Sequence, residues 1–344
     1  MRLAIQPDMD YTESYYPGWI DALTAQGIDH RLVDVLNPGW REALNSCDGL
    51  MWRVGHSPFD RAWGFRVLYT INTYLNLPIY PGLTDLWHYD EKLSQAYLFE
   101  ACDIPTPRTY AFSDMQRALA WAQSAQYPQV FKLSTGSASI GVRKVESVAE
   151  AERLIRLMFC EGITLGNWIE QPSRHTRLRR IASRIKQGMY RHLLRQQPRW
   201  PLGHWHWPTQ ANYVIFQDFI PDNSYDTRIT VIGERAFGFR RWNRGGDFRA
   251  SGSGQLDHDP AQIKRACIAT AFEAAQKLGT RCMSFDFVLQ DGVPLITEMS
   301  WTFLAAAIRA CPGHWRPDLT WVEGQLWPQQ AQVDDFIALI RKET

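Results

Sequence analysis

The sequence predicts an α/β protein in which a βαβ domain precedes a mixed α+β region. Three observations lead to this prediction. Short apolar strands alternate with helical patterns over about the first 80 residues, which is typical of a parallel sheet. A loop of small residues then separates two strand-like segments, and an Asp-Gly dipeptide near the C-terminus separates two more, which favours antiparallel hairpins.

The first part of the chain alternates between strand and helix patterns. We expect strands at residues 2–5, 31–35, 49–54 and 77–80. We expect helices between them at residues 15–26, 40–45 and 60–76. Strands joined by helices pair in parallel, so this part predicts a βαβ sheet. No Gly-x-Gly-x-x-Gly follows the first strand, so the sequence carries no dinucleotide-binding fingerprint.

A hairpin with a tip of small residues is predicted in the middle of the chain. Its strands are residues 129–133 and 142–145, and the tip, residues 134–141, is small or hydroxylic except for Ile140. Helices are expected around it at residues 91–101, 114–126 and 147–159. Asp90 is a candidate cap for the first of these helices, and Ser147 with Glu150 has the spacing of a capping box.

Strand patterns dominate the chain from residue 212 onward. We expect strands at residues 213–219, 227–232 and 235–241, the last two joined by the tight turn Gly233-Glu234. A helix is predicted at residues 260–278. The segments 283–289 and 293–299 flank Asp291-Gly292, which is a specific signal for a hairpin.

The composition excludes several classes of protein. With 344 residues, 45% of them apolar, the chain is long enough for two or three domains. Its net charge of +1 argues against a general nucleic-acid binder, which would carry an excess of Lys and Arg. No apolar run approaches the roughly 20 residues that span a bilayer, and the start lacks a signal-peptide pattern. The six cysteines have no framework spacing, so we expect a cytoplasmic protein without membrane insertion.

Residues 171–211 differ in composition from the rest of the chain. Nine Arg and Lys residues fall between Arg174 and Arg199 with no acidic residue among them, and a segment rich in Trp, His and Pro follows at 200–208. Two interpretations stay open. The segment is a solvated helix and connector, or its field attracts an anionic substrate.

Two carboxylates, Asp286 and Glu298, are predicted to face each other. They lie at nearly equal distances from the Asp291-Gly292 turn, on adjacent strands with apolar neighbours. Such a pair repels unless one group is protonated or a cation lies between them. Oxygen ligands suit Mg²⁺ or Mn²⁺ rather than zinc. The alternative is that one carboxylate pairs with an arginine.

A lysine and several arginines are candidates for binding phosphate. Lys132 ends an apolar strand just before the small-residue tip, where backbone N–H groups and an ammonium can together bind phosphate. Arg228, Arg240, Arg241 and Arg249 lie in or near predicted strands, and guanidinium groups suit carboxylates and phosphates. A strand-edge lysine and surface salt bridges are the simpler explanations.

These groups, in this order, resemble the ATP-grasp superfamily of carboxylate–amine ligases over nearly the whole chain. The matching segments are residues 89–92, 101–107, 131–141, 216–220, 225–228 and 247–249. Asp286 and Glu298 fall where the superfamily has its magnesium ligands. Within the superfamily the chain is most similar to ATP-grasp proteins encoded with surface-polysaccharide genes, through residues 247–254 and 52–56.

The resemblance implies a site for ATP and Mg²⁺ (or Mn²⁺). It assigns nucleotide binding to Lys92, Lys132, Ser134, Gly136, Ser137, Gln217, Asp218, Phe219, Ile220 and Asp226. It assigns metal binding to Asp286, Glu298 and Ser300, and catalysis to Arg228, Arg240 and Arg249. Two residues depart from the superfamily's pattern. Ser300 replaces the usual Asn and is a weaker ligand, and Ser284 replaces an arginine that some ligases carry.

The resemblance also implies an activity. The chain would phosphorylate a substrate carboxylate with ATP, and an amine would attack the acyl-phosphate to form an amide, releasing ADP and phosphate. The partners would be a small-molecule carboxylate and an amine, by analogy a sugar acid or an amino acid, and not nucleic acid; a homodimer is left open. The alternatives are an ATP-grasp kinase and a nucleotide-binding partner protein with weak activity.

The resemblance divides the chain into four parts. Residues 1–88 form the βαβ domain, and residues 89–165 form the lid of the ATP-grasp fold with its entry region. Residues 166–211 are a basic helical and aromatic insertion. Residues 212–344 form the C-terminal sheet domain with the metal site.

Overall fold

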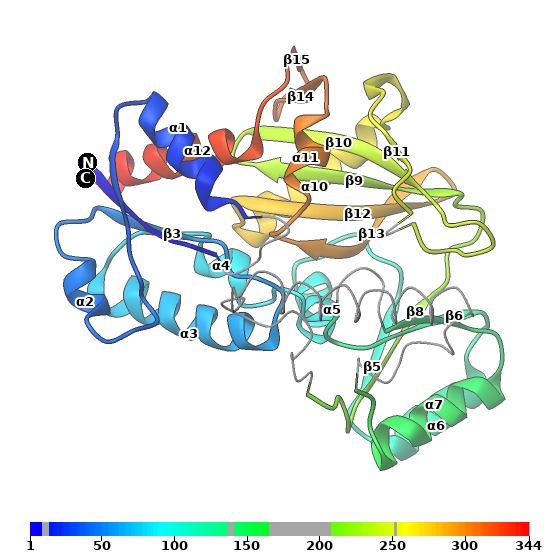
Figure 1. Ribbon diagram of the computed structural model, residues 1–344. Helices are drawn as coiled ribbons and strands as arrows, with labels where there is room; N and C mark the ends of the chain where they lie inside the picture. The colour runs from blue at the N-terminus through cyan, green and yellow to red at the C-terminus, as the bar shows by residue number, and fades with distance from the viewer. Residues whose placement is uncertain (9–13, 137–140, 165–207, 251–252, 344) are drawn as a thin grey trace, which may run out of the picture.

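Three β-sheets organise the chain (Figure 1). The structure is a computed structural model that describes residues 1–8, 14–136, 141–164, 208–250 and 253–343. The basic segment 174–199 and the aromatic and histidine residues at 200–207 lie outside these ranges, as does Ser137. None of the described helices is long and apolar enough to cross a membrane.

The N-terminal sheet is parallel, with strand order β2-β1-β3-β4. Its strands are β1 (Arg2–Gln6), β2 (Asp29–Leu32), β3 (Gly49–Trp52) and β4 (Ile79–Tyr80). Its helices are α1 (Tyr16–Ala25), α2 (Trp40–Ala43), α3 (Pro58–Leu75) and α4 (Leu83–Leu86). The predicted βαβ pattern is therefore confirmed. Strand β2 begins earlier than predicted, because Asp29 and His30 already pair with β1. It also ends earlier, and beyond its end the backbone N–H of Val35 donates to the side chain of Gln6 (2.7 Å).

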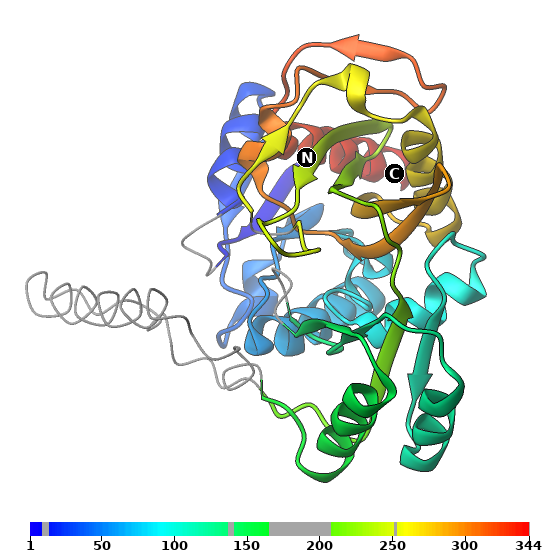
Figure 2. The ribbon, with the colours of Figure 1, turned by 90° about the vertical axis from the view of Figure 1, so that its right-hand side faces the viewer.

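The second sheet is antiparallel, with strand order β5-β8-β6-β7. Its strands are β5 (Thr109–Phe112), β6 (Gln129–Lys132), β7 (Val142–Val145) and β8 (Val214–Asp218). Helices α6 (Met115–Ser124) and α7 (Val148–Cys160) pack on it and enclose a separate core around Phe131 and Phe216 (Figure 2). The predicted hairpin at 129–145 is confirmed.

Two expectations about this part of the chain are wrong. Strand β8 pairs with β5 and β6, so it belongs to the second sheet, although we placed residues from 212 onward with the C-terminal sheet. Phe216 explains this, because its side chain is fully buried in the core of the second sheet. Asp90 does not cap helix α5 (Lys92–Ala101), whose N-cap is Glu91. The exact division into domains stays a prediction.

The C-terminal sheet has strand order β13-β12-β9-β10-β14-β15, with β11 paired to β10. Its strands are β9 (Tyr225–Ile232), β10 (Arg235–Trp242), β11 (Leu256–Asp257), β12 (Cys282–Gln290), β13 (Val293–Ser300), β14 (Gly313–Trp315) and β15 (Trp321–Glu323). The helical segments are η1 (Pro260–Gln262), α10 (Arg265–Leu278), α11 (Ala305–Arg309) and α12 (Pro328–Glu343). The predicted helix at 260–278 is interrupted, because Ile263 turns its buried side chain inward from an extended backbone.

Helix α12 ties the C-terminal end of the described chain to the N-terminal sheet. It packs against α1, where Trp19 Nε1 donates to Gln332 Oε1 (2.8 Å), and its apolar face covers β3 (Figure 1). Gly49 of β3 permits the close approach. A Cβ at this position would lie 2.7 Å from Phe336 Cζ and 2.9 Å from Ile340 Cδ1.

We therefore expect Gly49→Ala to lower the free energy of unfolding by about 1–3 kcal/mol, the usual cost of overpacking a core. Urea denaturation monitored by circular dichroism would measure it. Gly245→Ala is the matched control, because a Cβ there meets nothing within 4 Å. Equal stability of the two variants would contradict this account of the α12 contact.

Candidate active site

One face of the C-terminal sheet carries the three predicted metal ligands together with Asp226 and Arg228. The strand register pairs Asp226 with Arg241, and it places Asp286 between Arg228 and Glu298. Residues directly opposite in antiparallel strands project to the same face, and so do residues two apart. This face therefore carries Asp226, Arg228, Arg241, Ser284, Asp286, Glu298 and Ser300. The prediction that Asp286 and Glu298 face each other is confirmed.

Asp286 is held by two arginines. Arg228 donates from Nε to Oδ1 (2.6 Å) and from Nη2 to Oδ2 (2.8 Å), and Arg241 Nη2 lies 2.7 Å from the same Oδ2. Burial raises the pKa of this carboxyl, but Arg228 and then Arg241 outweigh burial, so the pKa lies well below its usual range. Asp286 is therefore ionised, and guanidinium groups supply the compensating charge.

The same network includes Asp226. Its Oδ1 accepts from Arg241 Nε at 2.7 Å, and its Oδ2 accepts from Nη2 of the same arginine at 2.5 Å. Burial raises the pKa of the Asp226 carboxyl more than Arg241 lowers it. Arg241 was one of the candidate arginines in the sequence but was not assigned to the site. The tight turn at Gly233-Glu234 could have placed it opposite Asp226, because the two residues are equidistant from that turn.

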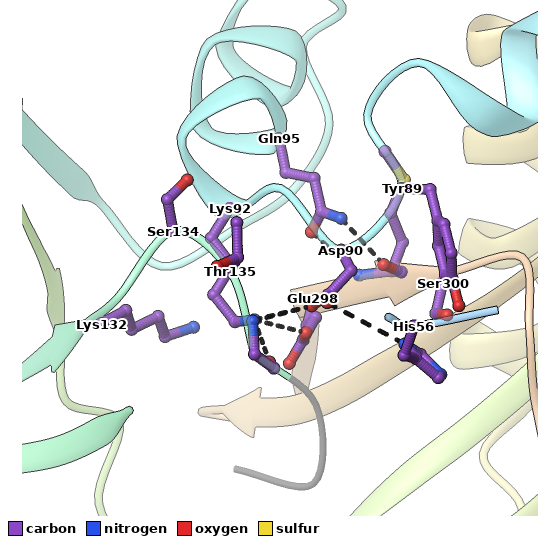
Figure 3. A network of polar contacts seen from close by, with 12 residues as sticks. His56, Tyr89, Asp90, Lys92, Gln95, Lys132, Ser134, Thr135, Glu298 and Ser300 are labelled. Atoms are coloured by element: carbon purple, nitrogen blue, oxygen red, sulfur yellow. Dashed lines mark hydrogen bonds and ion pairs between the residues drawn. The ribbon is translucent and has the colours of Figure 1, made fainter. Parts of the chain in front are cut away.

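Glu298 pairs with Lys92, which arrives from the start of helix α5 (Figure 3). Lys92 Nζ lies 2.9 Å from Glu298 Oε1 and donates to the carbonyl oxygen of Gly136 at 2.8 Å. Burial lowers the pKa of the Lys92 ammonium, but Glu298 and Asp90 raise it more, so its net pKa is above the usual value. Lys92 therefore carries its charge in a fully buried position.

Lys132 approaches the same strand from β6. Its Nζ donates to the carbonyl oxygen of Thr297 at 3.0 Å, and Figure 3 shows its side chain pointing toward Glu298. Burial is the main reason why the pKa of the Lys132 ammonium falls to about 8. The attraction of Glu298 opposes this fall, and the repulsion from Lys92 adds to it. The two lysines that we predicted from separate segments thus converge on one strand, β13.

The first residues of the small-residue tip are held in place by neighbouring elements. The backbone N–H of Ser134 donates to the Tyr213 hydroxyl at 2.8 Å, and that of Thr135 donates to Gln210 Oε1 at 3.0 Å. Lys92 N donates to the Ser134 carbonyl at 2.7 Å. Gln210 and Tyr213 escaped the sequence analysis, because they lie far along the chain from the tip and carry no local motif.

A cavity lies between the second sheet and the C-terminal sheet. It has a volume of about 150 Å³, and its lining includes the predicted hinge residues Gln217, Asp218, Phe219 and Ile220. Lys132, Asp226, Arg241, Arg249, Asp286 and Glu298 also line it. The predicted hinge and the polar face of the C-terminal sheet therefore border one space.

The hinge side chains have partners of their own outside the cavity. Gln217 Nε2 donates to Thr109 Oγ1 at 3.0 Å, and Asp218 Oδ1 accepts from Gln129 Nε2 at 2.8 Å. The backbone N–H of Asp218 is engaged as well, since it donates to the carbonyl oxygen of Arg108 at 2.9 Å. Phe219 and Ile220 follow the end of β8 and line the cavity, so theirs is the hinge backbone that a planar ligand can meet.

The two remaining predicted arginines lie apart from each other. Arg249 pairs with Asp247 through Nη2 (2.7 Å) and donates to the carbonyl oxygen of Val142 at 3.2 Å. It therefore links the loop between β10 and β11 to strand β7. Arg240 points to the opposite face of β10 from Arg241, where its Nε donates to Asp257 (3.1 Å). Arg240 does not line the cavity. The alternation of side chains along β10 explains this placement.

The donor set suits Mg²⁺ only in part. Glu298 is one-third exposed and supplies a carboxylate, and Ser300 supplies a hydroxyl two residues along the same face. Both oxygens of Asp286 already accept from arginines. Among the described residues, no group of three or more acidic, His or Cys side chains forms a metal cluster. Glu298 and Ser300 therefore fit the metal, whereas Asp286 fits it only if Arg228 moves away.

Comparisons with known proteins identify the fold. No protein-family model matches the chain, and no curated protein does. Among solved structures, the macrocyclase MdnC of Microcystis aeruginosa MRC, bound with precursor peptide MdnA, is 14% identical to this chain. The match covers 98% of this chain and 100% of the MdnC chain, with a TM-score of 0.58. D-alanine–D-alanine ligase from Bacillus anthracis is 12% identical, with full coverage of both chains and a TM-score of 0.57.

A RimK domain protein of the ATP-grasp type from Sphaerobacter thermophilus DSM 20745 is 16% identical over 98% of this chain and 100% of its own, with a TM-score of 0.54. These structural neighbours are ATP-grasp ligases. The fold class that we expected, an ATP-grasp fold with an N-terminal βαβ domain, is therefore confirmed.

The charge network predicts a pH-dependent stability. Breaking a buried ion pair by removing one partner costs about 3–5 kcal/mol, so Asp286→Asn should be less stable than the wild type by a few kcal/mol at pH 7. The folded-state pKa of Asp286 lies below its unfolded value of 3.8, so its contribution is present above about pH 4. That contribution is lost as pH falls further toward the folded-state pKa.

Urea denaturation of both proteins at pH 7 and pH 3 would test this. The difference in unfolding free energy should shrink at pH 3. A variant more stable than the wild type at pH 7 would show that carboxylate repulsion, not arginine pairing, dominates at Asp286.

Proposed function

We propose that this protein is an ATP-dependent ligase that joins a carboxylate to an amine through an acyl-phosphate and releases ADP and phosphate. The observation that carries the proposal is the convergence of Lys92 and Lys132 on β13, next to a cavity that the hinge borders. Two buried ammonium groups suit the phosphates of a nucleotide, and the cavity beside them suits its planar base. The ATP-grasp fold is consistent with this function.

The cavity would receive the adenine ring, and the lysines would receive the phosphates. Backbone groups of Phe219 and Ile220 would meet the base, because these residues follow the end of β8 and line the cavity. Lys92 already donates to the Gly136 carbonyl, so it is held beside the small-residue tip. Lys132 would meet a phosphate from the β6 side.

Glu298 and Ser300 would hold Mg²⁺, with Asp286 as a further ligand only if Arg228 turns away. A bound Mg²⁺ would supply charge neutralisation on the transferred phosphoryl group. Arg241 and Arg228 lie on the same face and would stabilise negative charge there, and Arg249 would orient the acyl group from the loop side.

Several finer points belong to the proposal as well. The substrates would be small molecules, by analogy a sugar acid or an amino acid, and the protein would belong with the ATP-grasp proteins encoded with surface-polysaccharide genes. The protein would act in the cytoplasm. An ATP-grasp kinase is the second candidate. A nucleotide-binding partner protein with weak activity is the third, since Ser300 and Ser284 depart from the pattern of the ligases.

One assay separates these candidates. The protein is incubated with ATP, Mg²⁺ and pooled small carboxylates, with and without hydroxylamine, and ADP release and hydroxamate formation are measured. A ligase that forms an acyl-phosphate gives a hydroxamate, because hydroxylamine intercepts that intermediate. ADP release with a phosphorylated alcohol and no hydroxamate would identify a kinase, and binding of ATP without any turnover would favour a partner protein.

The pKa of Lys132 predicts how nucleotide affinity depends on pH. Lys132 is mostly charged at pH 7 and mostly neutral at pH 9, because its pKa is about 8. A phosphate binds the charged form, so the affinity for Mg·ATP should fall by about tenfold between these pH values. Isothermal titration calorimetry would measure this fall.

Two variants sharpen the test. Lys132→Arg keeps its charge across this range, and its affinity should stay nearly flat with pH. Lys132→Ala should bind Mg·ATP about 100-fold more weakly at pH 7, the usual loss for one preorganised charge. Unchanged affinity in Lys132→Ala would remove this lysine from the phosphate site.

A further inference from the structure

We propose that Thr297 is a positioning residue, whose hydroxyl holds a β-bulge that turns Glu298 to the face of the sheet where Mg²⁺ would bind. The inference rests on the proposed function, and it adds to that site a residue to which the sequence analysis gave no role. Glu298 supplies a carboxylate to the site and pairs with Lys92 (Figure 3). Both contacts depend on the direction in which the Glu298 side chain leaves strand β13.

The pairing of β12 with β13 contains one extra residue. Ile296 lies opposite Phe287. The next pair joins Glu298 to Asp286, so β13 advances by two residues where β12 goes back by one. Thr297 is the extra residue, and a single extra residue in one of two paired strands is a β-bulge. Bulges often redirect side chains beside active sites, and this bulge lies directly before Glu298.

The bulge decides which face of the sheet Glu298 occupies. Side chains of a regular strand alternate between the two faces, so residues two apart share a face. Ile296 and Met299 are three residues apart, yet both are buried in the core that includes α10. In a regular strand, Glu298 would share the face of Ile296 and point into that core. The bulge instead places Glu298 and Ser300 on the face of Asp286.

The Thr297 side chain ties the bulge to the opposite strand. Its Oγ1 donates to the backbone carbonyl oxygen of Asp286 at 3.1 Å. Its own carbonyl oxygen accepts from Lys132 Nζ at 3.0 Å, and Thr297 lines the cavity together with Glu298. The extra residue is therefore bonded to β12 through its side chain and to β6 through its backbone.

Contacts on the outer edge of β13 fix the position of the bulge along the strand. Before the bulge, the backbone N–H of Ile296 donates to the carbonyl oxygen of Pro105 at 2.7 Å. After it, the N–H of Met299 donates to Gln95 Oε1 (3.3 Å), and the carbonyl of Met299 accepts from Gln95 Nε2 (2.9 Å). A bulge that moved along β13 would take these backbone groups away from their partners. The hydroxyl of Thr297 then acts on a bulge whose two ends are already held.

Substitutions at Thr297 isolate the effect of the hydroxyl. Thr297→Val removes the hydroxyl and keeps the branched shape, and Thr297→Ala removes it in a smaller side chain that cannot overpack the site. Thr297→Ser keeps the donor. Thr84→Val is the matched control. Thr84 Oγ1 likewise donates to a distant backbone carbonyl, that of Gly279 at 2.8 Å, but Thr84 does not line the cavity.

The test measures how much Mg²⁺ adds to nucleotide binding. Isothermal titration calorimetry gives the affinity for ADP with Mg²⁺ and with a chelator in its place, and the ratio of the two affinities is the contribution of the metal. We expect this ratio to fall by about tenfold or more in Thr297→Val and Thr297→Ala, the usual effect of removing a group that orients a metal ligand. The affinity for metal-free ADP should stay close to that of the wild type, because the hinge and both lysines are unchanged. Thr297→Ser and Thr84→Val should keep the wild-type ratio.

Failure of this inference is distinguishable from failure of the proposed function. If the wild type binds no ADP under either condition, the proposed function fails and the inference falls with it. If the wild type binds ADP and Mg²⁺ adds nothing, or adds as much in Thr297→Val and Thr297→Ala as in the wild type, the inference is wrong. Equal weakening with and without Mg²⁺ would also overturn it, because that pattern indicates general destabilisation. A fall of the ratio in Thr297→Ser or Thr84→Val would overturn it as well, since the cause would then not be the Thr297 hydroxyl.

Discussion

The antiparallel register of β10, β9, β12 and β13 is the constraint on which the candidate site depends. Because side chains alternate along each strand, this register brings two aspartates and two arginines, Asp226, Asp286, Arg228 and Arg241, onto one face. If any of these strands shifted by one residue, its charged side chains would point to the opposite face of the sheet, into the apolar layer under α10. The charges then satisfy one another, which makes such a dense set of buried ions tolerable in the folded protein.

Helix α5 and the second sheet each add a lysine to a site that is already neutralised. Lys92 reaches Glu298 from α5, and Lys132 reaches the carbonyl of Thr297 from β6. Each cation thus has an oxygen partner in this structure. Binding a polyanion in such a site is an exchange of partners, in which phosphate oxygens replace protein oxygens. The affinity would therefore reflect a difference between two sets of charge-assisted contacts rather than the sum of the new ones.

Local rules allowed part of this site to be predicted from the sequence. The Asp291-Gly292 turn placed Asp286 opposite Glu298, because a two-residue turn defines the pairing of the strands around it. The same reasoning applied to Gly233-Glu234 would have placed Arg241 opposite Asp226. Which cation neutralises Asp286 could not be deduced, since it depends on the pairing of β12 with β9 across 58 positions of the chain. The contact of Tyr213 with Ser134 depends on the pairing of β6 with β8 across 79 positions of the chain, which leaves no trace in local periodicity.

The position of α12 has a consequence for biosynthesis. The N-terminal βαβ unit is completed by residues 328–343, which cover β3 and bond to Trp19 of α1. During synthesis on the ribosome, these residues emerge last of the described chain. One apolar face of the first sheet therefore stays exposed while roughly 250 further residues are added. At about 5–20 residues per second that wait lasts tens of seconds at the slow end. The second sheet, with its own core around Phe131 and Phe216, has no such dependence and is free to fold earlier.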